Sequence, residues 1–181
     1  MKNLKISRKI LISFAIVIAA AIILGVASLV MVGAVGNVAN TYASETIPSV
    51  YSLWSARRAI LQCEESTLES TVVMTKAELD SIEDEIVAAR KTLDDALVAL
   101  GQSFPDFADE IAECNKRLQT VTTVRQSILA EAQKLTLEGN EAAYNIYHTE
   151  YVAAFDAAAE IMLDMNSQLE SAISERSPTW P

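Results

Sequence analysis

The sequence predicts an all-helical protein: a membrane-anchored up-down-up-down four-helix bundle whose first helix is continuous with an N-terminal transmembrane helix. Three observations lead to this fold class. Residues 10–36 contain no charged side chain, apolar residues beyond them recur at three- and four-residue spacing, and only five glycines and four prolines occur in 181 residues. No run of alternating apolar and polar residues favours a strand.

The uncharged segment 10–36 is long enough to cross a bilayer. As a helix its 27 residues would extend about 40 Å, which exceeds the ~30 Å hydrocarbon core. We expect residues 1–9 to be cytoplasmic and residues 37–181 to lie outside, because the flank before the segment is basic. A cleaved signal peptide is the alternative, but its apolar core is usually only ~7–15 residues long. The basic residues of the flank are Lys2, Lys5, Arg8 and Lys9.

The part of the chain after residue 36 is strongly acidic. It holds all 24 acidic residues and 10 of the 14 basic ones, a net charge of −14. Nucleic-acid binding needs a basic surface, so we expect no nucleic-acid partner. The charge also argues against tight docking on anionic lipid and favours a solvated surface. Its length suits one domain over residues 37–176, followed by a tail at 177–181.

The first two bundle helices are delimited by a proline, a capping motif and a glycine. The first helix continues from the membrane segment, has a kink or restart at residues 46–49 around Pro48, and ends near Met74. Thr75-Lys76-Ala77-Glu78 fits a capping box that begins the second helix. Gly101 suits the left-handed residue that ends it.

The last two helices are delimited in the same way. The third begins in Ser103-Phe104-Pro105-Asp106, and Gly139-Asn140 marks the turn into the fourth. Each helix has one apolar face. The first two faces are Val50, Leu53, Trp54, Ile60, Leu61, Leu68 and Val72, then Leu79, Ile82, Ile86, Ala89, Leu93, Leu97 and Leu100. The last two are Phe107, Ile111, Cys114, Leu118, Val121, Val124, Ile128 and Leu135, then Ala143, Tyr147, Tyr151, Ala154, Phe155, Ala158, Ile161, Met162, Met165, Leu169, Ala172 and Ile173.

Three segments carry a resemblance to a receptor family. The chain opens with MKNLKISRKILISFAIVI, which looks like the short basic start of these receptors. After the span comes ETIPSVYSLWSARRAIL, which is similar to their Ile-Pro element followed by apolar spacing and an arginine. Near the end comes EGNEAAYNIYHTEYVAAFDAAAEIMLDM, which resembles the turn into their last helix. Over residues 1 to about 176 the chain thus resembles the four-helix-bundle sensory domain of methyl-accepting chemotaxis receptors.

The resemblance implies a sensory domain outside the bacterial inner membrane. It implies a homodimer that senses a small molecule or a periplasmic binding protein by displacing the fourth helix against the first. Such receptors continue into a second span, a HAMP linker and a cytoplasmic coiled coil, none of which is in the 181 residues. We therefore expect a single-pass protein or part of a longer one. The alternative function is a membrane-anchored helical binding or structural module without signalling output.

Candidate ligand-binding residues lie on the first and fourth helices. The resemblance implies arginines on the outer part of the first helix, but residues 61–75 contain none. Arg57 and Arg58, closer to Pro48, are the candidates for gripping an anion; the alternative is that Arg57 pairs with a core or partner carboxylate. An aromatic group on the fourth helix suits either a small-molecule pocket or an ordinary bundle core. It comprises Tyr144, Tyr147, His148 and Tyr151.

Cys63 and Cys114 are the only cysteines. Helical rise places both thiols ~18–20 Å below the outer turn, which permits a disulfide in an oxidising compartment. The first and third helices are diagonal in such a bundle, however, and a bridge needs Cα atoms within ~7 Å. Two free core thiols are therefore the favoured interpretation.

No catalytic site, metal site or cofactor is expected. The sequence has no Gly-rich phosphate loop, no His and Glu pair at zinc spacing, and no nucleophile with an evident histidine base. His148 is the only histidine, which excludes a His-rich metal site. We interpret the protein as non-enzymatic.

Overall fold

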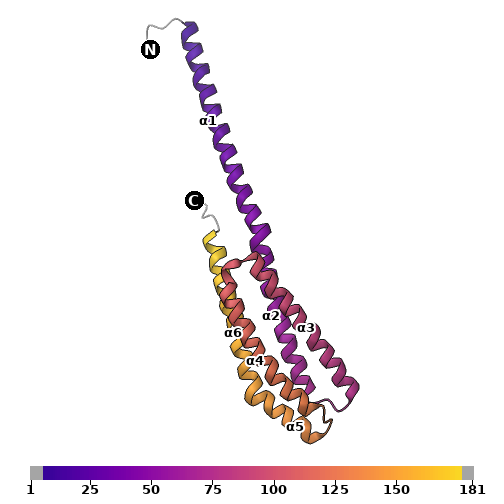
Figure 1. Cartoon of the computed structure of the whole chain (residues 1–181). Helices are drawn as coiled ribbons and strands as arrows, with labels where there is room; N and C mark the ends of the chain where they lie inside the picture. Colours follow the sequence, from indigo (N-terminus) through magenta and orange to yellow (C-terminus); the bar gives the residue numbers. More distant parts are fainter. Residues whose placement is uncertain (1–5, 177–181) are drawn as a thin grey trace. The chain divides into compact units, whose positions relative to one another are not determined.

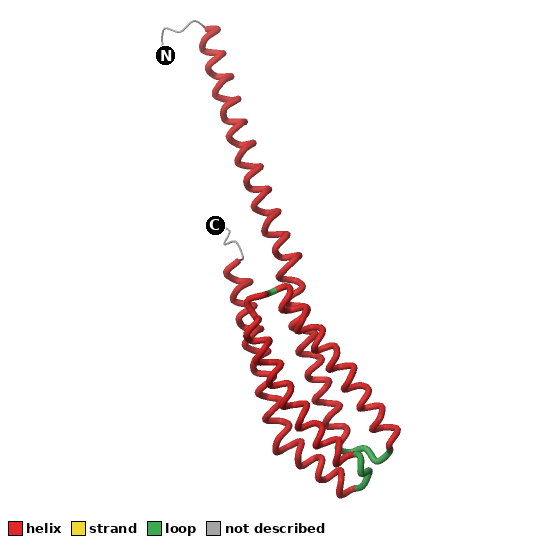
Figure 2. The backbone as a smooth tube through the Cα atoms, in the orientation of Figure 1, coloured by secondary structure: helices red, strands yellow, loops and turns green. Residues whose placement is uncertain are grey.

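The structure, a computed structural model, describes the backbone of residues 6–176 and the side chains of residues 10–175. All regular structure in this part is helical (Figure 2), which confirms the predicted fold class. The chain divides into two compact units, residues 1–43 and 44–181. The basic side chains predicted to be cytoplasmic, and the tail at 177–181, lie outside the described residues.

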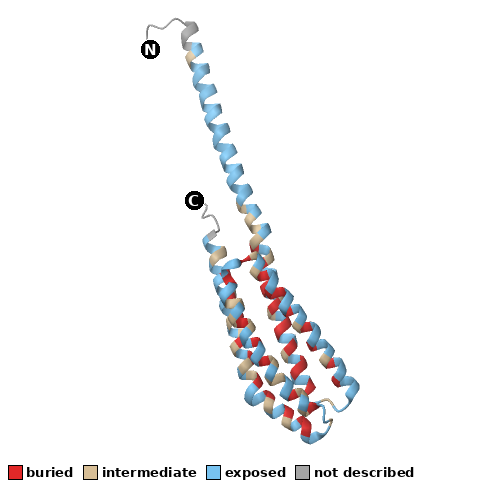
Figure 3. Ribbon diagram, viewed as in Figure 1, coloured by how far each residue is buried: buried red, intermediate tan, exposed pale blue. Residues whose placement is uncertain are grey.

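The first unit contains α1 (Ile6–Thr41), whose apolar side chains are exposed along most of its length (Figure 3). Among the described residues, the one helix that is long and apolar enough to cross a membrane includes this segment. Its most apolar 18-residue window has a mean hydropathy of 3.0, and none of that window is buried. An uncovered apolar surface of this extent fits a lipid environment rather than water.

The second unit is a four-helix bundle, in which α2, α3, α4 and α6 run side by side (Figure 1). The fourth helix of the bundle is built from α5, a π-helical turn η3 and α6 without a break. The bounds are α2 (Ile47–Ser70), α3 (Lys76–Ser103), η2 (Pro105–Phe107), α4 (Ala108–Ala132), α5 (Leu137–Ile146), η3 (Tyr147–Tyr151) and α6 (Val152–Arg176).

The restart predicted around Pro48 takes the form of a π-helical turn, η1 (Tyr42–Thr46). Every residue from Ile6 to Ser70 is helical, so no loop interrupts the chain at the predicted restart. Pro48 lies in the first turn of α2 and has no N–H to donate. A wider turn before it accommodates the missing hydrogen bond, since π-turns open the helical ladder locally.

α2 packs against α3 through a seam of small side chains. The seam alternates three- and four-residue steps and is fully buried, so the two backbones approach closely. Ser49 Oγ donates to Ser103 Oγ at 3.0 Å, and Cys63 Sγ lies 3.9 Å from the carbonyl oxygen of Ile86, which shows that the seam faces α3. Its members are Ser49, Ser52, Ala56, Ala59, Cys63, Ser66 and Ser70.

The seam corrects the apolar face predicted for the first helix. Leu53 and Ile60 are buried as predicted, but Val50, Trp54, Leu61, Leu68 and Val72 are exposed. The small polar residues take the interior positions because their hydroxyl groups bond to the helix itself. Thr67 Oγ1 donates to the carbonyl oxygen of Cys63 at 2.6 Å, and Ser70 Oγ donates to that of Thr67 at 2.6 Å.

The remaining core consists of large side chains on α3, α4 and the fourth helix. All seven apolar positions predicted on the second helix are buried. On α4 the largest fully buried side chains are Leu118 and Ile128, and they pack in one cluster with Met162 and Met165 of α6. This cluster and the α2–α3 seam together hold the bundle.

Of the two hydrogen bonds predicted for the capping box of α3, the one from the Glu78 amide to Thr75 forms. Thr75 Oγ1 accepts a hydrogen bond from the amide of Glu78 at 3.3 Å. The Glu78 carboxylate, however, accepts from the Thr75 hydroxyl at 2.7 Å. Both residues thereby fix the first turn of α3.

Two glycine predictions are wrong. Gly101 is helical, and α3 continues to Ser103. The turn before the fourth helix lies at residues 133–136, where Leu135 has a φ of 52° and Thr136 caps α5. Gly139 lies inside the first turn of α5, where its amide donates to Thr136 Oγ1 at 3.1 Å. A Cβ on Gly139 would lie 2.7 Å from the backbone oxygen of Glu131, so close approach rather than turn geometry requires the glycine.

Alanine substitutions should therefore have opposite effects at the two glycines. We expect Gly139→Ala to lower the free energy of unfolding by about 1–2 kcal/mol, because backbone must move. Gly101→Ala should stay within about 1 kcal/mol of wild type or gain stability, because it adds helix propensity and meets only the flexible Cδ1 of Ile111 at 3.3 Å. Urea unfolding of both variants, followed by circular dichroism, measures the difference, and equal stabilities would contradict the packing argument.

Candidate functional site

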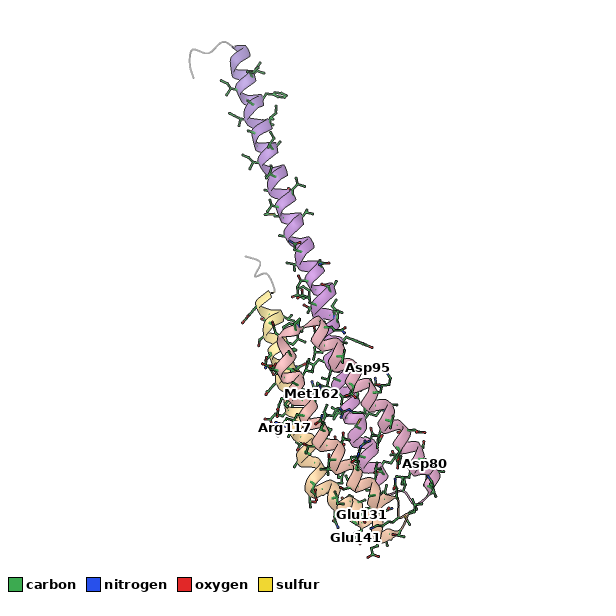
Figure 4. All side chains as sticks on the ribbon, in the orientation of Figure 1. Asp80, Asp95, Arg117, Glu131, Glu141 and Met162 are labelled. Atoms are coloured by element: carbon green, nitrogen blue, oxygen red, sulfur yellow. The ribbon has the colours of Figure 1, made fainter. Side chains whose placement is uncertain are left out.

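Three arginines in the bundle have no carboxylate partner among the described residues. Most described basic side chains outside α1 form ion pairs, and most of these are exposed, such as Arg117 Nε with Glu113 at 2.7 Å and Lys91 Nζ with Asp95 at 2.6 Å. Figure 4 labels Asp80 and Asp95 along α3 and Arg117 on α4. Arg57, Arg58 and Arg125 have no such partner among the residues that the structure describes. In a part of the chain where acidic residues outnumber basic ones, these three cations are the exceptions.

Arg57 and Arg58 line an open groove of about 640 Å³ between α2 and α3. The guanidinium carbon of Arg58 lies 5.7 Å from the ring centroid of Trp54, a cation–π distance. Further along, Glu65 and Glu69 of α2 line the groove together with Glu85 of α3. The groove is therefore positive at one end and negative at the other.

Arg57 also reaches the opposite flank of α2. It lines a hollow of about 170 Å³ with Leu61 of α2 and Leu163 of α6. Its side chain is half-buried and has no described ion pair, so the predicted alternative of a core carboxylate partner is not seen within the described residues. This position, in contact with two surface depressions, leaves its charge available to a ligand or to a second chain.

The predicted aromatic group divides into an inner and an outer part. Tyr147 and Tyr151 are buried and stacked, with ring centroids 5.3 Å apart. Tyr144 and His148 are exposed and meet edge to face at 4.4 Å. None of these residues lines the groove or the hollow around Arg57. Arg57 and Arg58 therefore lie in a different part of the bundle from the aromatic group.

Tyr147 links the π-helical turn η3 to α2. Its hydroxyl donates to Glu64 Oε1 at 3.3 Å. Burial raises the pKa of Glu64, and the hydrogen bond from Tyr147 acts in the opposite direction. Burial, reinforced by the charge of Glu64, raises the pKa of Tyr147 to about 12. The neutral phenol is thus favoured by the fold.

The raised pKa of Tyr147 should make the protein sensitive to alkali. In the unfolded chain the phenol ionises near pH 10.0, and in the fold near pH 12, so the unfolded state holds fewer protons between these values. We expect stability to fall as pH rises through this window, and Tyr147→Phe to reduce the fall. Urea unfolding at several pH values measures it, with the exposed Tyr144→Phe as the control. The same pH dependence in Tyr147→Phe as in wild type would contradict the assignment.

Cys63 and Cys114 are free and buried in the structure. Burial raises the pKa of both thiols, that of Cys114 to about 11, so neither is a thiolate at neutral pH. Within the described residues, no group of three or more side chains of the metal-binding types comes together.

Sequence reasoning missed the contacts that join distant helices. Arg90 donates through its terminal nitrogen to Thr122 Oγ1 and to the carbonyl oxygen of Leu118, both at 3.4 Å. The partners of the Tyr147–Glu64 bond are 83 residues apart. Contacts at i and i+4 on one helix, such as Trp54–Arg58 and Tyr147–Tyr151, are the ones that a sequence signal could have found.

The comparisons with known proteins identify the kind of module. A family model described as a four-helix-bundle sensory module for signal transduction matches residues 3–178. No curated protein and no solved structure matches the chain. The match spans α1 and the whole bundle, and it confirms the family resemblance predicted from the sequence.

Proposed function

Because the chain belongs to the family of four-helix-bundle sensory modules of chemotaxis receptors, we propose that it is the extracytoplasmic sensory part of a bacterial membrane receptor that binds a small organic anion. Residues 10–36 anchor it in the inner membrane with residues 1–9 in the cytoplasm. The exposed apolar surface of α1 supports the anchor, and the basic flank supports the orientation.

The uncompensated arginines are the observation that carries the ligand proposal. Arg57 and Arg58 have no described carboxylate partner, and both line a groove of small-molecule size in which the Arg58 guanidinium lies over the face of Trp54. An arginine without a partner gains most from a carboxylate, which it can hold through two hydrogen bonds. Glu65 and Glu69 in the same groove disfavour a second negative group at the other end of the ligand.

The exposed face of α2 fits a second copy of this chain as its binding partner. Four large apolar side chains recur there at seven-residue intervals, which is the spacing of a helix–helix seam. The charges beside them include both signs, Arg58 and Glu65, so a second copy supplies each with an opposite charge. The apolar residues are Ile47, Trp54, Leu61 and Leu68, with exposed fractions of 63, 58, 55 and 39%.

The groove and this apolar face share Trp54 and Leu61. A partner copy seated on the face would therefore border the ligand, and ligand binding would favour one arrangement of the two α2 helices over another. Packed helix interfaces change between discrete arrangements, which suits transmission of a small displacement. The proposed output is a shift of the fourth helix relative to α2.

A ligand screen on the full chain in detergent tests the proposal. Carboxylic acids, amino acids, amines and metal ions are compared by thermal unfolding, and binding to the folded state at 100 times Kd adds about 2.7 kcal/mol. We expect hits among carboxylates, and we expect Arg57→Ala and Arg58→Ala to abolish them. Arg117→Ala, which removes an exposed arginine that is paired with Glu113, is the matched control.

Three outcomes would overturn parts of this assignment. Binding that survives in both arginine variants would place the ligand elsewhere, and the buried aromatic group around Tyr147 would become the next site to test. A folded dimer that binds none of the compounds would favour recognition of a periplasmic binding protein. A folded monomer without any ligand would favour a membrane-anchored structural module.

A further inference from the structure

The interior of the bundle contains a small cavity that the groove does not reach. Its volume is about 20 Å³, which is enough for one water molecule or an ion of similar size. It lies between α2, α3, α4 and the π-helical turn η3. Its walls are mostly apolar, and its polar lining consists of Cys63, Arg90, Thr122, Arg125 and Tyr151.

The hydroxyl of Tyr151 is the one buried donor of this lining that is left over. Tyr151 is fully buried, and its hydroxyl has no hydrogen-bond partner among the described residues. The Thr67 hydroxyl is close enough to lower the pKa of Tyr151, but its oxygen does not meet hydrogen-bond geometry with the Tyr151 hydroxyl, and its own proton is donated to the carbonyl oxygen of Cys63 at 2.6 Å. An unpartnered buried hydroxyl costs about 1–3 kcal/mol, so a guest that accepts from it would be favoured.

The other polar groups are already committed. Thr122 Oγ1 donates to the carbonyl oxygen of Leu118 at 2.8 Å. Arg90 pairs with Asp94 at 2.9 Å and donates to the Leu118 carbonyl oxygen and Thr122 Oγ1. The Cys63 thiol is directed at the carbonyl oxygen of Ile86 and is neutral because burial raises its pKa.

Arg125 makes the cavity electropositive. It is half-buried, lines the cavity, and has no carboxylate partner among the described residues. Its charge acts against the effect of burial on the pKa of both Cys63 and Tyr151, so its field reaches both. Asp94 pairs with Arg90 and its charge acts on Cys63, and Glu64 is the acidic group whose charge acts on Tyr151. The lining itself contains no acidic residue.

We propose that this cavity is a binding site for one small monovalent inorganic anion of about the size of chloride, held by the hydroxyl of Tyr151 and the guanidinium of Arg125. A water molecule is the competing occupant, because the Tyr151 hydroxyl can accept as well as donate. The positive charge of Arg125 and the absence of an acidic residue from the lining favour an anion over water. A spherical anion needs donors and positive charge alone. Larger anions such as sulfate or gluconate do not fit a cavity of about 20 Å³.

The position gives the site a structural consequence. Tyr151 ends η3, and π-helical turns leave a helical ladder with strained or unmatched groups that are often used at functional sites. An anion between Tyr151 and Arg125 would tie the fourth helix to α4. The proposal concerns the bundle interior and stands whether or not the groove at Arg57 binds an organic ligand.

Thermal unfolding of the full chain in detergent, with sodium gluconate replaced stepwise by sodium chloride at constant ionic strength, tests the site. We expect a saturable rise in Tm with chloride. Tyr151→Phe keeps the ring and removes the hydroxyl, and Arg125→Gln removes the charge. Each should raise the half-saturating chloride concentration about tenfold or more, as the loss of a charge-assisted hydrogen bond predicts. Arg117→Gln, which removes an exposed arginine on the same helix, should leave it unchanged.

A bromide-soaked crystal of the full chain provides the direct readout. An anomalous peak within hydrogen-bond distance of Tyr151 Oη, lost in Tyr151→Phe, is the expected result. A Tm that does not depend on chloride, or the same dependence in wild type and Tyr151→Phe, would overturn the proposal. So would density at the site without anomalous signal, because that outcome assigns the cavity to water.

Discussion

Replacing Ala56 by leucine should lower the free energy of unfolding by about 1–3 kcal/mol, and by more if the helices cannot separate. Ala56 is a fully buried member of the small-residue seam between α2 and α3. The seam residues on either side of it are held to α3 by contacts at Ser49 and Cys63, so a larger side chain has no free volume. Relief requires either separation of the two helices or strained rotamers.

Urea unfolding of Ala56→Leu, followed by circular dichroism, measures this loss. The control is Gln62→Leu, the same new side chain on the same helix at an exposed position, where surface substitutions usually stay within about 0.5 kcal/mol. A variant that is as stable as Gln62→Leu would mean that α2 and α3 are not closely packed at Ala56. The description of the seam would then be wrong.

The seam also explains where pattern reading succeeded and where it failed. The faces of the later helices were predicted almost completely, because leucine, isoleucine and methionine mark buried positions by their hydrophobicity. The face predicted for the first helix was mostly wrong, because the interior of α2 is built largely from serine, threonine, alanine and cysteine. Residues of these four types have intermediate hydrophobicity and do not mark a helix face as buried. The hydroxyl groups of the serines and threonines can be buried because carbonyl oxygens of the same helix accept hydrogen bonds from them.

Turn prediction failed for a related reason. Glycine was read as a residue of left-handed conformation, but Leu135 adopts that conformation and Gly139 is helical. What Gly139 provides is the absence of a side chain against the Glu131 carbonyl oxygen, a tertiary contact. No local pattern reports how closely two backbones approach, so a sequence alone places such a turn only to within a few residues.

The candidate sites were predictable in their residues but not in their grouping. Arg57 and Arg58 stand out in an acidic sequence, and the tyrosines cluster visibly. Whether an arginine has an ion-pair partner, however, depends on neighbours from other helices. The pairing of Tyr147 with Glu64, and the cavity that Tyr151 and Arg125 both line, depend on how each helix is rotated and shifted along its axis. Hydrophobic periodicity fixes that rotation and shift only to within a residue or more.

Replacing Leu61 by glutamate should weaken self-association of the chain by about 2–4 kcal/mol, or roughly 30- to 1,000-fold in the dimer dissociation constant. Leu61 lies in the middle of the exposed apolar face of α2 and also borders the groove with Arg57. In a parallel pair of α2 helices, Leu61 would meet Leu61 of the second copy near the interface between the two copies. Two buried like charges in apolar surroundings cannot be accommodated without loss of contact.

Sedimentation equilibrium of the full chain in density-matched detergent measures the dissociation constant. Leu137→Glu makes the same change at an exposed apolar position on α5, outside the α2 face, and should leave it unchanged. Circular dichroism should give both variants the wild-type helix content, because neither leucine is buried. Equal association of wild type and Leu61→Glu would remove α2 as the interface. The exposed heptad positions would then be available to a different partner, and coupling between the groove and a second copy would have no structural basis.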